Sequence, residues 1–292
     1  MSETSTVVTL KILEGINLPA GIAVELQGRV LHVIFDRPER KNAMNLQMWQ
    51  VLPRIIHLAE GNDQVRAIAF SGRTADSFSA GADISEFSTV RSGAANSRHY
   101  SAAVQEAELA IIECTKPTLA LVRGWCVGGG CELALACDIR IGDTTAKMGI
   151  TPAKLGIVYS QTSTTRLVEE VGAAWARLLL LTGEIVKADT ALRISLLHEV
   201  HLTEDVEARW NAVLGRVTGG APVTLAGAKV LVGRAAAGQG QEDAVANSWY
   251  ERSYASDEYR IGVTSFLARE KPDFSAVPWP TAISAGDQTI PE

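Results

Sequence analysis

The residues best suited to chemistry lie in the stretch Gly128–Ala134, which reads Gly-Gly-Gly-Cys-Glu-Leu-Ala. Three glycines leave backbone N–H groups open to close approach by a ligand. The apolar segment that follows predicts a helix over 131–138, whose N-terminus has free N–H groups and the positive end of a dipole. Glu132, in the first turn, places a carboxylate beside that point. Together these parts predict a site that stabilises an oxyanion.

A second loop of small residues lies earlier in the chain, at Phe78–Ile84, and reads Phe-Ser-Ala-Gly-Ala-Asp-Ile. It follows an apolar run over 65–70, which predicts a strand, and a turn at Ser71-Gly72. Small side chains again allow the backbone to approach a ligand closely. This loop is therefore a second candidate for main-chain contacts to a substrate.

The two loops, with Lys116-Pro117 and Cys137-Asp138-Ile139, occur in the order and spacing of the crotonase (enoyl-CoA hydratase/isomerase) superfamily, which the chain resembles. The segment Phe35–Met44 looks like the CoA-binding turn of that family. The resemblance implies an α/β fold, a ββα spiral of stacked sheets with a C-terminal helical trimerisation region. It divides the chain into an N-terminal extension (1–21), a spiral core that holds the CoA and catalytic site (22–205), and a C-terminal helical region and tail (206–292).

The resemblance also implies a task, which is to stabilise the enolate of a CoA thioester with two backbone N–H groups. Carried over by position, these donors are Ala82 and Gly129. The homotrimer or dimer of trimers typical of the family is expected, and no metal or cofactor beyond the CoA of the substrate. The other candidates for CoA contacts are Arg40, Lys41, Ala43, Ala80, Asp83, Ile84, Phe266 and Lys271.

Side chains near the donors would decide the reaction. Hydratases of the family use two carboxylates to activate water and move a proton. The first matches Glu132, but the position of the second is Pro152, and no Asp or Glu occurs between Asp143 and Glu169. The sequence therefore disfavours efficient hydration, and isomerisation as well.

The segment Thr151–Tyr159 is most similar to the active-site loop of methylmalonyl-CoA decarboxylases, where Thr-Pro replaces the acidic pair and a Tyr follows Leu-Gly. A departure is Ala82, where those enzymes carry His. A malonyl-type thioester needs no base, because loss of carbon dioxide sends its electrons into the oxyanion hole. A second carboxylate would repel it by ~1 to 4 kcal/mol at ~4 Å. The neutral phenol of Tyr159 is suited to orienting the substrate carboxylate.

Three hypotheses follow. The preferred one is an acyl-CoA lyase that decarboxylates a small (methyl)malonyl-type CoA thioester, with Glu132 and Tyr159 as catalytic residues. The second is an enoyl-CoA hydratase or isomerase in which Glu132 works alone or a carboxylate from elsewhere in the chain joins it. The third is an acyl-CoA binder without turnover, which the intact glycine loops and Glu132 disfavour.

Composition excludes several other classes. The chain has 292 residues, 47% of them hydrophobic, which suffices for a sizeable core. Its net charge of -6 and lack of a long basic run argue against nucleic-acid binding. The four cysteines have no metal-finger spacing and predict reduced, buried thiols, and the N-terminus lacks the features of a signal peptide. We therefore expect a cytoplasmic protein without a membrane segment.

Apolar periodicity predicts the elements that must hold the loops. A hairpin is expected over 24–35. Region 86–102 is polar and Ser-rich, and an irregular tail begins near Pro272. Strands alternating with helices favour an α/β core with right-handed crossovers. The other expected strands are 65–70, 118–122, 139–141 and 197–202, and the expected helices are 42–59, 100–114, 131–138, 164–182, 188–194, 207–217, 224–236 and 242–255.

Overall fold

The computed structural model describes residues 15–280 and contains two β-sheets. The larger sheet has the strand order β1-β2-β3-β5-β7-β10, and its strands are parallel apart from the β1/β2 hairpin. The smaller sheet has the order β4-β6-β8-β9. The strands are β1 (Ile22–Gln27), β2 (Val30–Phe35), β3 (Ala67–Gly72), β4 (Ser77–Ser79), β5 (Thr118–Val122), β6 (Trp125–Val127), β7 (Ile139–Asp143), β8 (Lys147–Gly149), β9 (Ile185–Lys187) and β10 (Glu199–His201).

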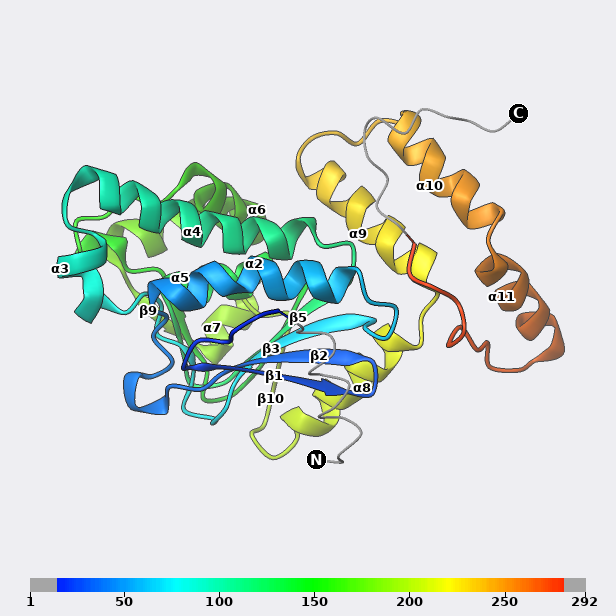
Figure 1. Ribbon diagram of the computed structural model, residues 1–292, viewed down its shortest axis with the longest axis horizontal. Coiled ribbons are helices and arrows are strands. Elements are labelled where there is room, and N and C mark those ends of the chain that lie inside the picture. Colours follow the sequence, from blue (N-terminus) through cyan, green and yellow to red (C-terminus); the bar gives the residue numbers. More distant parts are fainter. Residues whose placement is uncertain (1–14, 281–292) are drawn as a thin grey trace.

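Helices cover both faces of the larger sheet (Figure 1). In this view α2 and α4 lie over one face, α8 lies against the other, and α9, α10 and α11 project to the right. The helices are α2 (Leu46–Glu60), α3 (Phe87–Val90), α4 (Gly93–Glu113), α5 (Gly129–Ala136), α6 (Gln161–Thr182), α7 (Ala188–Arg193), α8 (Val206–Thr218), α9 (Pro222–Ala236), α10 (Ala244–Tyr254) and α11 (Asp257–Ala268).

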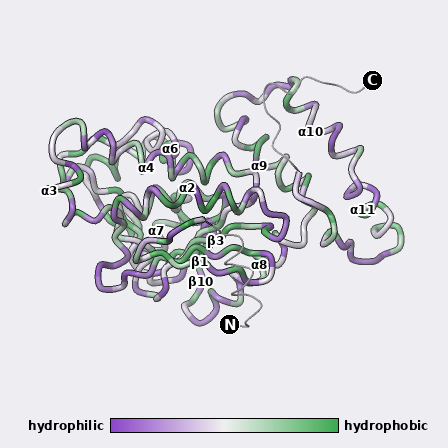
Figure 2. The backbone as a smooth tube through the Cα atoms, viewed as in Figure 1, coloured by the Kyte–Doolittle hydropathy of each residue, from purple (hydrophilic) through white to green (hydrophobic). Residues whose placement is uncertain are grey.

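The strands of the larger sheet are apolar on both faces, as a covered parallel sheet requires. In β3, Ile68 and Phe70 belong to the main core under α2 and α4. Ala67 and Ala69 point the other way and pack in a second cluster with Trp210 of α8. Figure 2 shows the central strands coloured as hydrophobic. The sheet is thus a rigid platform, and the loops that leave its strands are fixed at their starting points.

The structure confirms most of the predicted elements. The hairpin, the strand over 118–122 and the alternation of strands and helices are present, and the fold is the predicted α/β fold of two sheets. The helix after the three glycines begins at Gly129, two residues earlier than expected. The predicted strand over 197–202 is only Glu199–His201.

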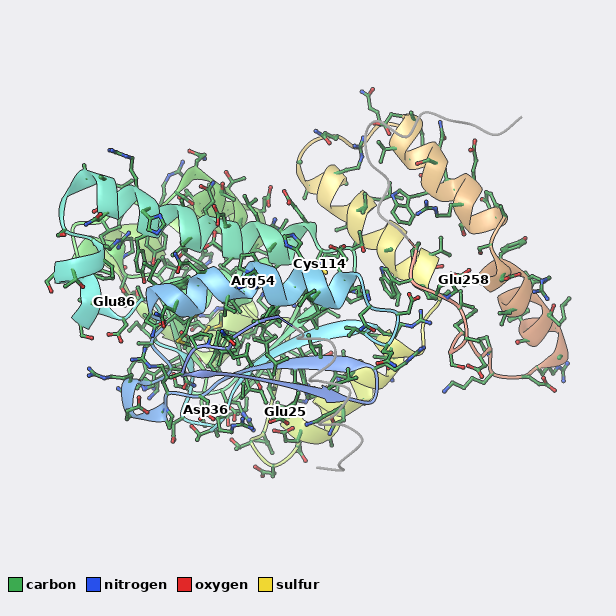
Figure 3. The ribbon with its side chains drawn as sticks, viewed as in Figure 1. Glu25, Asp36, Arg54, Glu86, Cys114 and Glu258 are labelled. Carbon is green, nitrogen blue, oxygen red and sulfur yellow. The ribbon has the colours of Figure 1, made fainter. Side chains whose placement is uncertain are left out.

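Two helical regions were not predicted. The polar region 86–102 contains α3 and the first turns of α4, because Tyr100 and later apolar residues give α4 a buried face despite its polar start. Helix α11 was not predicted, because its buried residue is the charged Glu258 instead of an apolar stripe. Glu258 (Figure 3) accepts a hydrogen bond from the Val223 backbone N–H at 3.2 Å, which links α11 to the start of α9.

The predicted division at 205/206 stays a prediction. Helix α8, which it assigns to the C-terminal region, packs on the larger sheet through Trp210 and Leu214. Most of the predicted N-terminal extension, residues 1–14, lies outside the described residues, as does the end of the predicted tail, 281–292.

The side chain of Asn42 links the turn after β2 to strand β4 of the smaller sheet. This buried side chain accepts a hydrogen bond from the Arg37 backbone N–H at 2.8 Å and donates one to the Ser77 carbonyl at 2.7 Å. The φ of 56° at Asn42 is also more easily adopted by Asn than by Ala. We expect Asn42→Ala to lower the free energy of unfolding by about 2–4 kcal/mol, because two buried backbone groups lose their partner.

Urea denaturation measures this loss. The matched control is Asn211→Ala on α8, whose exposed side chain predicts a change within about 0.5 kcal/mol. A similarly small change for Asn42→Ala would show that the turn does not depend on this amide.

Candidate active site

The two small-residue loops predicted from the sequence lie against each other. Gly81 has a φ of +87°, and a Cβ placed on it would lie 2.6 Å from the Val127 carbonyl oxygen and 2.9 Å from the Gly129 nitrogen. A Cβ on Gly130 would lie 2.4 Å from the Ser79 carbonyl oxygen. All three distances are shorter than real Cβ contacts, so only glycine permits this approach. The backbone of the first loop is thereby held beside the N-terminus of α5.

One N–H group from each loop is free for a ligand. Met44 donates to the Gly81 carbonyl at 2.7 Å and accepts from the Asp83 N–H at 2.8 Å, so the N–H of Ala82, between them, points away from Met44. Gly129 is the first residue of α5, where an N–H has no acceptor within the helix. Among residues 15–280 neither N–H has a hydrogen-bond acceptor. This is the geometry that an oxyanion hole requires.

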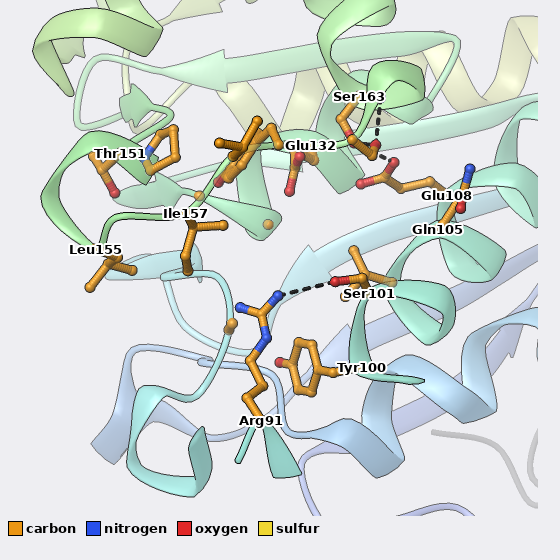
Figure 4. A pocket seen from close by; sticks show the side chains of 18 of the residues that line it. Arg91, Tyr100, Ser101, Gln105, Glu108, Glu132, Thr151, Leu155, Ile157 and Ser163 are labelled. Atoms are coloured by element: carbon orange, nitrogen blue, oxygen red, sulfur yellow. Dashed lines mark hydrogen bonds between the residues drawn. The ribbon is translucent and has the colours of Figure 1, made fainter. Parts of the chain in front are cut away.

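A pocket opens beside these donors (Figure 4). Its wall comes from the 80–84 loop, the turn between α3 and α4, one face of α4, the N-terminus of α5, the 151–160 loop and the first turn of α6. Leu155, Ile157 and Val158 give it an apolar side, and Ser101, Gln105 and Ser163 give it a polar one. A substrate can therefore reach the donors from the surface.

Glu132 lies at the inner end of this pocket. Its carboxyl Oε2 is 3.7 Å from the position that a Cβ on Gly129 would take. The side chain is buried, and this burial, followed by the nearby charge of Glu108, raises its pKa well above the usual value of a carboxyl group. This environment favours the protonated carboxyl group, which lies where it can donate a proton beside the oxyanion donors.

Glu108 brings a second carboxyl group into the pocket, and sequence reasoning missed it. It comes from α4, is 3% exposed, and its Oε2 accepts a hydrogen bond from the Ser163 hydroxyl at 2.9 Å. Its Oε1 is buried without a hydrogen-bond partner in the described part of the chain. Burial raises its pKa to about 7, although the Ser163 bond lowers it. The sequence held a signal, since Val104, Glu108 and Ile111 share the inner face of a predicted helix.

Polar bonds between α4 and the first turn of α6 set the position of Glu108. Ser160 caps α6 by accepting from the Ser163 N–H at 3.0 Å, and the hydroxyls of these two serines are 2.8 Å apart. Gln105, one turn before Glu108, donates to the Thr162 hydroxyl at 3.1 Å. The Ser163 hydroxyl also lowers the pKa of Glu132, so it is near both carboxyl groups. Figure 4 shows Glu108 joined to Ser163 and facing Glu132.

Tyr159 and Pro152 lie where the loop prediction places them. Both line the pocket, and Pro152 supplies no acid at the position that the sequence identified as departing from hydratases. The Tyr159 hydroxyl is 3.5 Å from the position of a Cβ on Gly128, next to the oxyanion donors. Burial raises the pKa of Tyr159 above its usual value, so the phenol is neutral. Its role stays a prediction.

The predicted CoA-contact residues are divided between several places. Ala80 and Ile84 line the pocket together with Ala82. The carboxylate of Asp83 pairs with Arg37 at 2.9 Å and accepts from Ser85, so it stabilises the loop itself.

The other CoA candidates lie outside the pocket wall. Arg40 and Lys41 are exposed in the turn after β2, where the Lys41 Nζ is 4.6 Å from the centre of the Trp125 ring, and Ala43 is half-buried in the same turn. Phe266, 82% exposed on α11, and Lys271 belong to the projecting C-terminal part, away from the α5 end of this chain (Figure 1). Contacts of these residues with CoA stay predictions.

Comparison with known proteins decides the family. The family model described as enoyl-CoA hydratase/isomerase matches residues 25–276. The chain belongs to the enoyl-CoA hydratase/isomerase family. The resemblance predicted from the glycine loops is confirmed, and with it an acyl-CoA enzyme as the class of the protein.

The similar proteins include hydratases. The chain is 29% identical over 253 residues to the short-chain-enoyl-CoA hydratase of Clostridium acetobutylicum, covering 86% of this chain and 95% of that protein. It is 29% identical over 259 residues to the crotonyl-CoA hydratase of Syntrophomonas wolfei, covering 87% and 97%. A solved enoyl-CoA hydratase/carnithine racemase from Magnetospirillum magneticum superposes with a TM-score of 0.84 at 29% identity, covering 88% and 96%. The crotonase fold is thereby confirmed.

Among residues 15–280, no group of three or more His, Cys, Asp or Glu residues could hold a metal ion. No helix in the same part of the chain is long and apolar enough to cross a membrane. The four cysteines are unpaired and buried, as their apolar surroundings predicted.

The raised pKa of Glu108 predicts a pH-dependent stability. A carboxyl group whose pKa is higher in the folded protein than in the unfolded chain stabilises the fold while it is protonated. Its contribution to the free energy of unfolding is complete below the unfolded pKa of 4.5 and is lost as the pH rises through about 7. Glu108→Gln cannot ionise. Between about pH 5 and about pH 8 its free energy of unfolding should therefore fall less than that of the wild type, by on the order of 2 kcal/mol.

Urea denaturation across this pH range provides the measurement. Glu106→Gln, on the exposed side of the same helix, is the matched control and should follow the wild type. Parallel pH curves for Glu108→Gln and the wild type would contradict a neutral, buried Glu108.

Proposed function

We propose that the protein hydrates an enoyl-CoA, using Glu108 and Glu132 as the two carboxyl groups and the N–H groups of Ala82 and Gly129 as the oxyanion hole. The observation that carries this proposal is the placement of Glu108 in the pocket, facing Glu132 across Ser163. It removes the main objection to hydration, which was the proline at position 152. The hydratase names of the relatives support the same choice.

The groups suit the two halves of the reaction. Glu108, with a pKa of about 7, is the base that takes a proton from water as the water oxygen bonds to C3. The C2–C3 electron pair moves onto the thioester, and the developing negative charge on oxygen is stabilised by the two N–H donors. Protonated Glu132 then gives its proton to C2. Transfer of a proton from Glu108 to Glu132 through the intervening Ser163 hydroxyl restores the starting state.

Substitution of either acid tests this assignment. Glu132→Gln and Glu108→Gln should each lower kcat for hydration of crotonyl-CoA by about 10²- to 10⁴-fold, the usual contribution of a positioned acid or base. The loss of absorbance of the conjugated thioester measures the rate. Glu106→Gln should retain the wild-type rate. Full activity of Glu108→Gln would show that Glu132 is the only one of the two carboxyl groups that the reaction needs.

Decarboxylation of a (methyl)malonyl-type CoA thioester is the second candidate, and the position of Tyr159 favours it. A neutral phenol beside Gly128 can hydrogen-bond a substrate carboxylate next to the oxyanion donors. If this reaction occurs, Tyr159→Phe should lower conversion of methylmalonyl-CoA to propionyl-CoA by about 10-fold or more, since a hydrogen bond to a charged group is lost. Hydration should be barely affected. Mass spectrometry of both products distinguishes the two roles, and equal tolerance of both reactions would make Tyr159 a packing residue.

We further propose that the protein assembles as a homotrimer or a dimer of trimers and works without a cofactor beyond the CoA of its substrate. Exposed apolar side chains on the projecting α11 support assembly, since large exposed patches mark interaction surfaces. Phe266 and Leu267 are 82% and 76% exposed in the single chain.

A further inference from the structure

The pocket contains a cation that the proposed hydration does not use, and we propose that it binds a carboxylate at the far end of the substrate's acyl chain. Arg91 follows α3 and lines the pocket with Ser101 and Leu155. The substrate class would then be short acyl-CoA thioesters whose acyl group ends in a carboxylate. This inference rests on the proposed acyl-CoA function and narrows its substrate.

Packing holds Arg91 in place. The centre of its guanidinium group lies 4.7 Å from the ring centroids of both Phe87 and Tyr100. A terminal nitrogen donates to the Ser101 hydroxyl at 3.3 Å. Figure 4 shows the guanidinium directed into the pocket, toward Ile157 and Ser101. A flat cation fixed between aromatic rings loses little freedom when it binds an anion.

Arg91 has no acidic partner of its own. Within residues 15–280 no carboxylate lies within 4.0 Å of its guanidinium, the distance that defines an ion pair. The nearby acids are engaged elsewhere: Asp83 pairs with Arg37, and Glu86 accepts from the Leu46 backbone N–H at 2.7 Å. A guanidinium has five donors and stays charged at all ordinary pH values. Most of its donors thus remain available to a ligand.

The rest of the pocket does not neutralise this charge. Glu108 and Glu132 also line it, but burial raises the pKa of both, to about 7 for Glu108, which favours their neutral forms. The wall beside Arg91 mixes apolar Leu155 and Ile157 with the hydroxyl of Ser101. Such a wall accommodates a short methylene chain with a charged end.

Binding of saturated thioesters tests this inference separately from catalysis, because they cannot be hydrated. Isothermal titration calorimetry compares glutaryl-CoA with pentanoyl-CoA, and succinyl-CoA with butyryl-CoA, which differ only in the terminal carboxylate. The wild-type protein should bind at least one dicarboxylic thioester about 10- to 100-fold more tightly than its neutral partner, as expected for a charge-assisted hydrogen bond. Equal binding within both pairs would overturn the proposal, whether or not the protein hydrates an enoyl-CoA.

Variants test whether Arg91 is responsible for the tighter binding of dicarboxylic thioesters. Arg91→Gln should remove this preference while leaving affinity for pentanoyl-CoA within about 2-fold, and Arg91→Lys should retain part of it because the charge remains. Arg98→Gln, exposed on α4, is the matched control and should retain all of it. If Arg91→Gln kept the preference, or weakened all thioesters equally, Arg91 would not be the group that recognises the acyl carboxylate.

Discussion

The contact between two backbones, at Gly81 and Gly128-Gly129, is the constraint on which the site depends. An added Cβ on Gly81 would lie 2.6 Å from one main-chain oxygen, so the loops can be this close only without side chains. The approach places the N–H of Ala82 beside the N–H that begins α5. The two donors then converge without any side chain having to hold them. Because backbone donors cost little reorganisation when charge develops, this arrangement suits an enolate-forming reaction.

The larger fold keeps the two loops in register. Parallel strands β3 and β5 are neighbours in the larger sheet, and the segments that follow them form β4 and β6, which pair in the smaller sheet. The Asn42 amide accepts from the Arg37 N–H within the turn after β2 and donates to the Ser77 carbonyl of β4, which joins that turn to β4. Bonds from Glu108 and Gln105 then tie α4 to the start of α6. The pocket is thus enclosed by elements whose positions are set by the same sheets as the donors.

The sequence predicted the parts of the site that are continuous in the chain. Ala82, Gly129 and Glu132 belong to loop motifs whose spacing is visible without a structure. Glu108 could not be found by the same reasoning, because it comes from α4, before the glycine helix, and not from the loop where a second carboxylate was sought. Only packing of α4 against α5 brings it opposite Glu132. The preference for decarboxylation followed from that apparent gap, which the proposed role of Glu108 would fill.

In the proposed site, reactivity and recognition depend on different side chains. Glu132 and Glu108 are buried acids with raised pKa values, which are typical of catalytic groups. Arg91 is a fixed cation on the opposite wall. The polar residues Ser160, Gln161 and Thr162 at the start of α6 are consistent with a polar pocket of this kind.

The most direct test of the account is mass spectrometry of crotonyl-CoA incubated with the wild-type protein in ¹⁸O-labelled water. The two-carboxyl site predicts a 3-hydroxyacyl-CoA product that carries the label on C3. Recovery of unlabelled crotonyl-CoA, in preparations that convert methylmalonyl-CoA to propionyl-CoA, would contradict hydration and establish decarboxylation in its place.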